Sequence, residues 1–244
     1  MKIYNSRKFD NLPDAILFDT DNTLYDYEIA HFAAYQAVSK KVSNLFKIKQ
    51  SDFDKAFIEA RSQVKSRLEG TAASHNRLLY FQRMLELVGL GSQVLVALDL
   101  EQTYWRTFLN NAILYDDLKK FLEKCRNLSI PMALITDLTA QIQFRKIVYF
   151  GLDHFFDYIV TSEEAGFDKP SELPFKIALE KIMPTGQNIW MIGDHIECDM
   201  AGAKKSIDAT TLLFNKGKGD NLSSKFIDAS FNKYSKLLDF FEDL

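Results

Sequence analysis

The sequence has few cysteines, prolines and glycines, and it contains no internal repeat. Its 244 residues include 2 Cys, 5 Pro and 10 Gly. Cys125 and Cys198 lie far apart in the sequence and make up neither a CxxC metal pair nor a disulfide framework, so we expect a reducing compartment. With 47% hydrophobic and 26% charged residues, the chain is neither fibrous nor wholly disordered.

The sequence also lacks a surplus of positive charge and a long apolar run. Its 30 Lys+Arg against 33 Asp+Glu disfavour nucleic-acid binding, because nothing would neutralise a phosphate backbone. No apolar window is long enough to span a bilayer, and the first residues do not resemble a secretory signal. We expect a soluble, cytoplasmic protein that binds neither nucleic acid nor membranes, while its oligomeric state is not predicted.

Short apolar runs that end in polar residues predict the buried parallel strands of an α/β protein. Helical patterns lie between them, as where Leu118, Phe121, Leu122 and Cys125 recur at helical spacing. This βαβ alternation predicts a doubly wound, Rossmann-like sheet with helices on both faces. The expected strands are 15–18, 132–135, 158–160, 189–192 and 211–214.

A long helical pattern over residues 25–109 predicts an inserted α-helical bundle. The predicted domains are therefore a core of residues 1–24 and 110–244 and an insertion of residues 25–109. Residues 217–223 are expected to form a polar loop, and 226–231 an edge strand. Within the bundle, Ser74 is expected to cap a helix that leaves Arg77 in solvent. The first helix is expected to bury Ile29, Phe32, Tyr35, Val38, Val42 and Leu45.

Polar residues follow each predicted strand, where ligands of parallel sheets bind. Every one of these strand ends offers side-chain oxygen atoms. The segments are Asp19-Thr20-Asp21-Asn22-Thr23, Thr136-Asp137, Thr161-Ser162 and Gly193-Asp194.

These residues resemble the four motifs of the haloacid dehalogenase (HAD) superfamily of phosphohydrolases. Asp19-x-Asp21-x-Thr23-Leu24 is similar to the first motif and Thr136 to the second. Lys169-Pro170 is similar to the third, and Gly193-Asp194-x-x-x-x-Asp199 to the fourth. The helical insertion resembles the cap domain that one subfamily carries between its first two motifs. One DxD is weak evidence, but four ordered motifs at predicted strand ends indicate the family.

Phosphoryl transfer to a carboxylate needs an ionised nucleophile, a divalent cation and a proton source for the leaving alkoxide. Asp19 is the predicted nucleophile. Residues i and i+2 leave a strand on the same side, so Asp21 can face the same pocket. The resemblance assigns Asp21 the roles of general acid and then general base, and it makes the Asp21 backbone carbonyl a metal contact.

Mg²⁺ is the expected cofactor, because it binds oxygen atoms and needs only one or two protein carboxylates. Asp19 and Asp194 are expected to supply them. Asp199 is expected to be a weaker ligand, to act through water, or to orient Lys169. The Thr136 hydroxyl, backbone N–H groups and the Lys169 ammonium are the predicted phosphate donors.

The sequence departs from the family pattern at Asp137, where Asn commonly follows the motif-two Thr or Ser. A further carboxylate near the phosphate would weaken binding unless it points away or caps the next helix. Asp21 argues for phosphate chemistry rather than dehalogenation, since a halide leaving group needs no acid.

We therefore expect a Mg²⁺-dependent phosphomonoesterase that acts on a small phosphorylated metabolite through an aspartyl-phosphate. Two alternatives remain open. A phosphosugar mutase of the same fold would return the phosphoryl group to its substrate. A non-catalytic binding or regulatory protein would retain the fold, but it is expected to lose Asp19 or a metal carboxylate, and the sequence keeps both.

Overall fold

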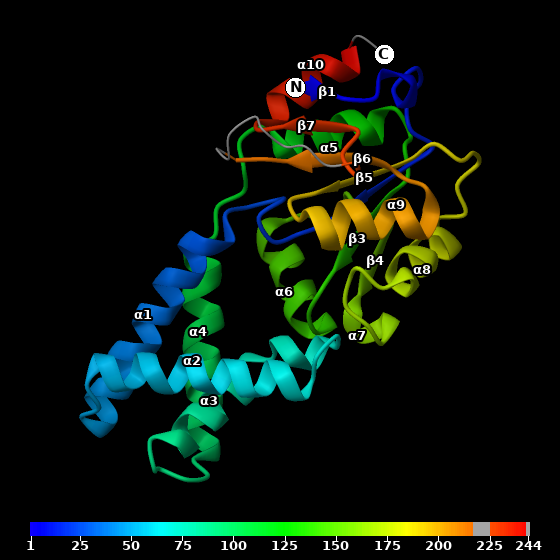
Figure 1. Ribbon diagram of the computed structural model, residues 1–244. Coiled ribbons are helices and arrows are strands. Elements are labelled where there is room, and N and C mark those ends of the chain that lie inside the picture. Colours follow the sequence, from blue (N-terminus) through cyan, green and yellow to red (C-terminus); the bar gives the residue numbers. More distant parts are fainter. Residues whose placement is uncertain (217–224, 243–244) are drawn as a thin grey trace. The chain divides into compact units, whose positions relative to one another are not determined.

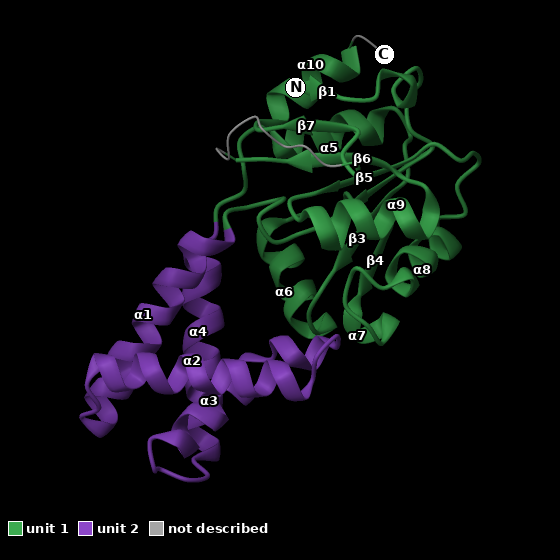
Figure 2. Cartoon of the chain, in the orientation of Figure 1, with its two compact units in different colours: residues 1–26, 113–244 green, residues 27–112 purple. Residues whose placement is uncertain are grey.

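The computed structural model describes residues 1–216 and 225–242, so the predicted loop 217–223 lies outside the described residues. The chain divides into two compact units, which Figure 2 colours separately. Unit 1 is Met1–Asp26 with Ile113–Leu244, and unit 2 is Tyr27–Ala112. Among the described helices, none is long and apolar enough to cross a membrane.

Unit 1 is built on a seven-stranded sheet in the order β1-β7-β6-β5-β2-β3-β4 (Figure 1). The strands from β2 to β7 pair in parallel, and β1 pairs antiparallel with β7. The predicted α/β class is confirmed, and each predicted strand is observed to within one residue at either end. The strands are β1 Lys2–Ile3, β2 Ala15–Phe18, β3 Met132–Thr136, β4 Tyr158–Thr161, β5 Ile189–Gly193, β6 Thr210–Phe214 and β7 Ala229–Phe231.

The prediction of an edge strand over 226–231 is wrong in position and length. The observed strand β7 starts at Ala229 and lies between β6 and β1, so the two-residue β1 forms that edge. A strand as short as Lys2–Ile3 has too few residues to show a periodic pattern, which is why the sequence does not reveal it.

Helices cover both faces of the sheet, which explains why its strands are continuously apolar. Alternate side chains point to opposite faces. On one face Leu17 packs in a cluster with Phe175 of α8; on the other, Phe18 contacts Phe121 of α5. The helices of unit 1 are the 3₁₀ helix η1 Ser6–Lys8, α5 Leu118–Asn127, α6 Ala140–Phe150, α7 Ser162–Ala165, α8 Glu172–Ile182, the π-helix η3 Ile196–Ala201, α9 Gly202–Ile207 and α10 Tyr234–Glu242.

The strand order reverses direction at β2. From β2 the chain builds β3 and β4 to one side, and then β5 returns to pair with the other side of β2. The crevice beyond the carboxyl ends of strands at such a switch point is where α/β sheets bind ligands. The residues after β2 and β5 are therefore neighbours at this edge.

Unit 2 is a helical bundle of α1 Tyr27–Phe46, α2 Gln50–Arg67, the 3₁₀ helix η2 Ala72–His75, α3 Arg77–Leu87 and α4 Val94–Asn111. The predicted buried face of α1 is wrong at Ile29, Phe32 and Leu45, which are 60%, 65% and 53% exposed. Ala30 and Ala34 are buried instead. Small side chains allow helices to approach closely, and α1 packs against α4.

The start of α3 also differs from the prediction. Asn76, not Ser74, caps the helix, since its side chain accepts a hydrogen bond from the backbone N–H of Leu78 at 2.9 Å. Arg77 is buried rather than solvated, and its guanidinium donates to the Tyr27 hydroxyl. The sequence alone could not decide between Ser74 and Asn76 as the cap, because both are capping residue types that lie within three residues of the helix start at Arg77.

Candidate active site

Two adjacent strand ends bring distant acidic residues together. Asp19 follows β2, and its backbone N–H donates to the Ile192 carbonyl of β5 at 2.9 Å. Asp194 directly follows β5. Asp199 lies within the π-helix η3 that comes next, a type of helix that occurs frequently at functional sites.

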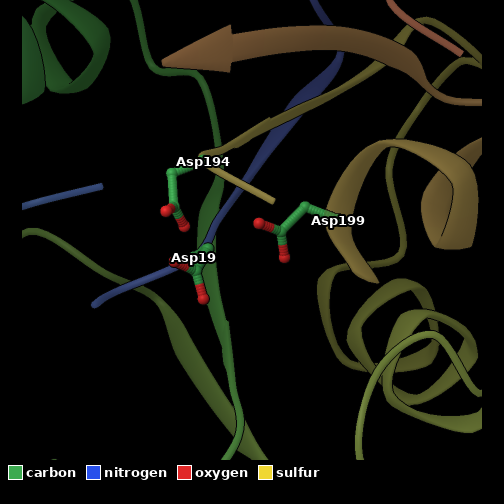
Figure 3. A group of neighbouring side chains, drawn as sticks. All are labelled: Asp19, Asp194 and Asp199. Carbon is green, nitrogen blue, oxygen red and sulfur yellow. The ribbon is translucent and has the colours of Figure 1, made fainter. Parts of the chain in front are cut away.

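The carboxylates of Asp19, Asp194 and Asp199 form a cluster in which one oxygen of each lies within 4.8 Å of the others (Figure 3). We call these three residues the acidic trio. Asp19 and Asp199 are buried, and Asp194 is half-buried. Residue 193 must be glycine, because any Cβ atom there would lie 2.4 Å from an Asp199 oxygen.

Lys169 is buried against the acidic trio, with only 2% of its side chain exposed. Its Nζ donates to Asp19 Oδ1 at 2.7 Å and to Asp199 Oδ1 at 2.6 Å. The other Asp19 oxygen accepts a hydrogen bond from the Thr23 hydroxyl at 2.9 Å. The carboxylate of Asp19 is therefore held at both oxygens.

The charges in this cluster do not balance. Burial raises the pKa of the Asp19 carboxyl well above its ordinary value; Lys169 opposes that rise, while Asp199 and Asp194 add to it. Burial by itself would lower the pKa of Lys169, but Asp19 and Asp199 hold it well above its ordinary value. One ammonium thus faces three carboxyl groups, and a further cation would favour the ionised form of Asp19.

The donor set of the acidic trio suits a small, hard divalent cation. All three side chains offer carboxylate oxygens, which are the ligands that Mg²⁺ prefers. Asp194 is only partly buried, which is compatible with the several water ligands that Mg²⁺ usually keeps. These residues therefore fit the expected Mg²⁺.

Thr136 stands at the end of β3, beside the loop that follows β2. Its hydroxyl shares a 2.6 Å hydrogen bond with the Thr20 hydroxyl. It also accepts a hydrogen bond from Gln143 Nε2 at 2.7 Å, and the same amide donates to the Asp137 carbonyl at 3.1 Å. When Thr20 is the donor in the shared bond, the Thr136 proton is available to a phosphate oxygen.

The Asp21 carboxylate lies outside the acidic trio. It accepts hydrogen bonds from Lys146 Nζ, at 2.8 and 3.1 Å to its two oxygens, and from the Tyr25 hydroxyl. Its side chain is 32% exposed, so the group is open to solvent on one side. The metal contact expected of Asp21 through its backbone carbonyl stays a prediction.

Asp137, the departure from the motif-two pattern, binds the loop that carries Lys169. Its Oδ1 accepts a hydrogen bond from the backbone N–H of Lys169 at 2.9 Å. Burial raises the pKa of Asp137, and the Lys169 charge partly opposes this. The N-cap position of the following helix α6 is Thr139, whose side chain makes no capping hydrogen bond. Asp137 therefore does not cap that helix but holds the Lys169 loop.

We expect Asp137→Asn to lower the KM for phosphorylated substrates about two- to tenfold. Asn keeps the Oδ1 acceptor for the Lys169 N–H but removes a negative charge near the predicted phosphate position. Steady-state kinetics and the inhibition constant of inorganic phosphate measure this effect. Asp153→Asn, at a residue whose side chain is 65% exposed, is the matched control. An unchanged or higher KM in Asp137→Asn would contradict the expectation.

The sequence analysis assigned no definite role at the site to four residues that the structure places there: Lys146, Tyr25, Gln143 and Thr20. A usable signal exists for two of them. Gln143 and Lys146 lie on the buried face of α6 together with Ile147. A polar and a charged residue on the apolar face of an amphipathic helix indicate partners inside the fold.

Comparisons with known proteins find matches over most of this chain. The family described as haloacid dehalogenase-like hydrolase matches residues 13–206. A ribulose-1,5-bisphosphate 5-phosphatase of Halopiger xanaduensis is 36% identical over 202 residues, which cover 82% of this chain and 84% of that protein. A glyceraldehyde 3-phosphate phosphatase of Pyrococcus abyssi is 28% identical, and the match covers 83% of this chain and 82% of that protein.

A solved structure shares the fold. The magnesium-bound HAD hydrolase YfnB of Bacillus subtilis superposes with a TM-score of 0.71 at 20% identity. The superposition covers 95% of this chain and 100% of that one. The sheet and the helical insertion are thus a known combination.

Proposed function

The chain belongs to the haloacid dehalogenase-like hydrolases, and on that premise we propose that it hydrolyses the phosphate ester of a small sugar phosphate in a Mg²⁺-dependent reaction. Similar members of the family are phosphatases, and phosphate monoester hydrolysis is the reaction class of this enzyme. The observation that carries the proposal is the acidic trio with Lys169 at the carboxyl ends of β2 and β5.

The proposed reaction has two displacements at phosphorus. In the first, an Asp19 oxygen forms a bond to phosphorus while the bond from phosphorus to the ester oxygen breaks, and Asp21 donates its proton to that leaving oxygen. In the second, Asp21 takes a proton from water, whose oxygen displaces Asp19 and releases phosphate. Asp19 thereby returns to its ionised form, and Asp21 returns to the protonated form in which it enters the first step.

The remaining site residues bind the phosphoryl group. The Lys169 ammonium and the Thr136 hydroxyl are suited to stabilise negative charge on the phosphoryl oxygens. Mg²⁺, held by Asp19 and Asp194 with Asp199 as a further ligand or as an orienting residue for Lys169, would offset the repulsion between the phosphate and the carboxylates.

The substrate class is inferred from the relatives. One has ribulose 1,5-bisphosphate and another glyceraldehyde 3-phosphate in its name. Both compounds are short sugars with a phosphate ester on a terminal carbon. We therefore propose a terminal sugar phosphate as the substrate of this chain.

The metal requirement is the first test. With Mg²⁺ present, we expect phosphate release from at least one of ribulose 1,5-bisphosphate, glyceraldehyde 3-phosphate and p-nitrophenyl phosphate. Excess EDTA should abolish the release, and excess Mg²⁺ should restore it, because the trio would otherwise lack its cation. Mg²⁺ should also raise the Tm, since it would bind only the folded chain.

Asp194→Asn provides the matched variant for the metal test. It removes one carboxylate from the half-exposed side of the trio, and we expect the Mg²⁺ concentration at half-maximal activity to rise at least about tenfold. Hydrolysis that is insensitive to EDTA would contradict the Mg²⁺ proposal. Accumulation of a bisphosphorylated sugar in place of phosphate would indicate the mutase alternative.

A further inference from the structure

A buried lysine on α6 pairs with Asp21, the predicted acid and base of the reaction. Lys146 has 1% of its side chain exposed and lies on the same face of α6 as the buried Gln143 and Ile147. Burying an ammonium group is unfavourable unless an anion and hydrogen-bond acceptors compensate for the lost hydration. The position of Lys146 therefore depends on its partner.

The partner carboxylate is that of Asp21. Lys146 Nζ lies 2.8 and 3.1 Å from the two Asp21 oxygens, and the Tyr25 hydroxyl donates to the nearer one. The Asp21 side chain is 32% exposed. The buried Lys146 ammonium and the buried Tyr25 hydroxyl thus hold the Asp21 carboxylate, which is partly exposed to solvent.

Packing keeps both donors in place. The ring of Tyr25 is 1% exposed and lies 4.9 Å from the ring of Phe150 on α6. The Lys146 Nζ lies 5.8 Å from the centroid of the Tyr25 ring, within the range of a cation–π contact. Residues 21 and 25 also form an isolated backbone bridge. The donors are therefore preorganised before any substrate binds.

We propose that Lys146, together with Tyr25, is a positioning residue that holds the Asp21 carboxyl group where it transfers protons to the leaving oxygen and from water. The inference rests on the proposed function, in which Asp21 is the acid and base. A carboxylate free to rotate would have to be ordered in each catalytic cycle, whereas this ordering is achieved when the chain folds.

A purely structural ion pair between α6 and the loop after β2 would have different consequences. Its loss would lower stability and would slow every substrate to a similar degree. Loss of a positioning residue for the general acid depends on the leaving group instead. A strongly basic sugar alkoxide must be protonated as it leaves, while a weakly basic p-nitrophenolate can leave without a proton.

The experiment compares Lys146→Met with the wild type in single turnovers at saturating Mg²⁺. We expect release of the sugar product from whichever of ribulose 1,5-bisphosphate and glyceraldehyde 3-phosphate the wild type hydrolyses to slow at least about tenfold, because general acid catalysis contributes about 10²- to 10⁴-fold. Release of p-nitrophenolate should slow less than about threefold, and the KM for both compounds should change little. Asp21→Asn should show the same selectivity with a larger loss.

Two further variants make the test independent of folding defects. Tyr25→Phe keeps the ring that packs on Phe150 and removes only the hydroxyl donor, so it should show the same selectivity with a smaller loss. Arg145→Met, on the exposed face of α6, is the control and should behave like the wild type. Thermal melts confirm that each variant is folded at the assay temperature.

The outcomes separate this inference from the proposed function. Equal losses for both leaving groups in Lys146→Met and Tyr25→Phe, or no loss in either, would overturn the positioning role. A wild-type enzyme that releases no phosphate, or an Asp19→Asn variant that stays active, would overturn the proposed function instead.

Discussion

Asp19→Asn is expected to lower kcat at least about 10⁴-fold while the chain stays folded. The variant lacks the carboxylate that would form the bond to phosphorus, and Asp21, the other carboxylate at this strand end, lies outside the acidic trio and pairs with Lys146. Losses of this size are typical when a covalent nucleophile is removed. Phosphate release under saturating substrate and Mg²⁺ measures the effect.

The fold of Asp19→Asn should survive because the substitution removes one of three clustered negative charges. The amide oxygen can still accept a hydrogen bond from Lys169, which also keeps its bond to Asp199. We expect the Tm in EDTA to be equal to or higher than that of the wild type. Asp10→Asn, at an exposed residue of unit 1, is the control. Normal turnover by Asp19→Asn would refute the nucleophile assignment.

Lys169→Met is expected to lower the free energy of unfolding by about 3–5 kcal/mol, as breaking a buried ion pair does. Asp19 and Asp199 would then lie buried without their shared ammonium. Because Lys169 opposes the rise in the pKa of Asp19, the pKa of Asp19 should rise further without it, and the folded chain would bind more protons than the unfolded chain. The destabilisation should therefore grow as the pH rises from about 4 to 7.

Urea unfolding across this pH range, with and without Mg²⁺, checks the Lys169 prediction. Mg²⁺ should restore part of the stability, because a divalent cation at the trio compensates the same carboxylates. Lys181→Met, which removes a partly exposed lysine paired with Glu164, should cost at most about 1 kcal/mol. A loss of that size in Lys169→Met would mean that the buried pair contributes no more than a surface one.

The strands and the order of the candidate site residues can be predicted from the sequence. Parallel strands covered on both faces require unbroken apolar runs, and polar residues end those runs where the chain leaves the sheet. Asp19, Thr136 and Asp194 are therefore recognisable as strand-end residues without any structure. Lys169 is recognisable only through its place in the ordered motifs, because a lysine before a proline has no local pattern of its own.

Other features depend on contacts between residues that are distant in the chain. Asp137 accepts its hydrogen bond from the backbone of Lys169, and a local pattern cannot show where an isolated carboxylate points. The exposure of Ile29 and Phe32 on α1 also depends on tertiary contacts. Helical periodicity identifies an apolar stripe, but the small residues Ala30 and Ala34 make the closer helix contact.

The sequence by itself determined the chemistry available at the edge of the sheet, because residue type and distance from a strand end are local properties. Only the tertiary structure decided which charges meet there. The pair of Lys146 and Asp21 joins residues 125 positions apart, and Lys169 reaches Asp19 across 150 positions. Such pairs form because folding removes water from an ion, and the opposite charge that packing brings within reach compensates for part of that loss.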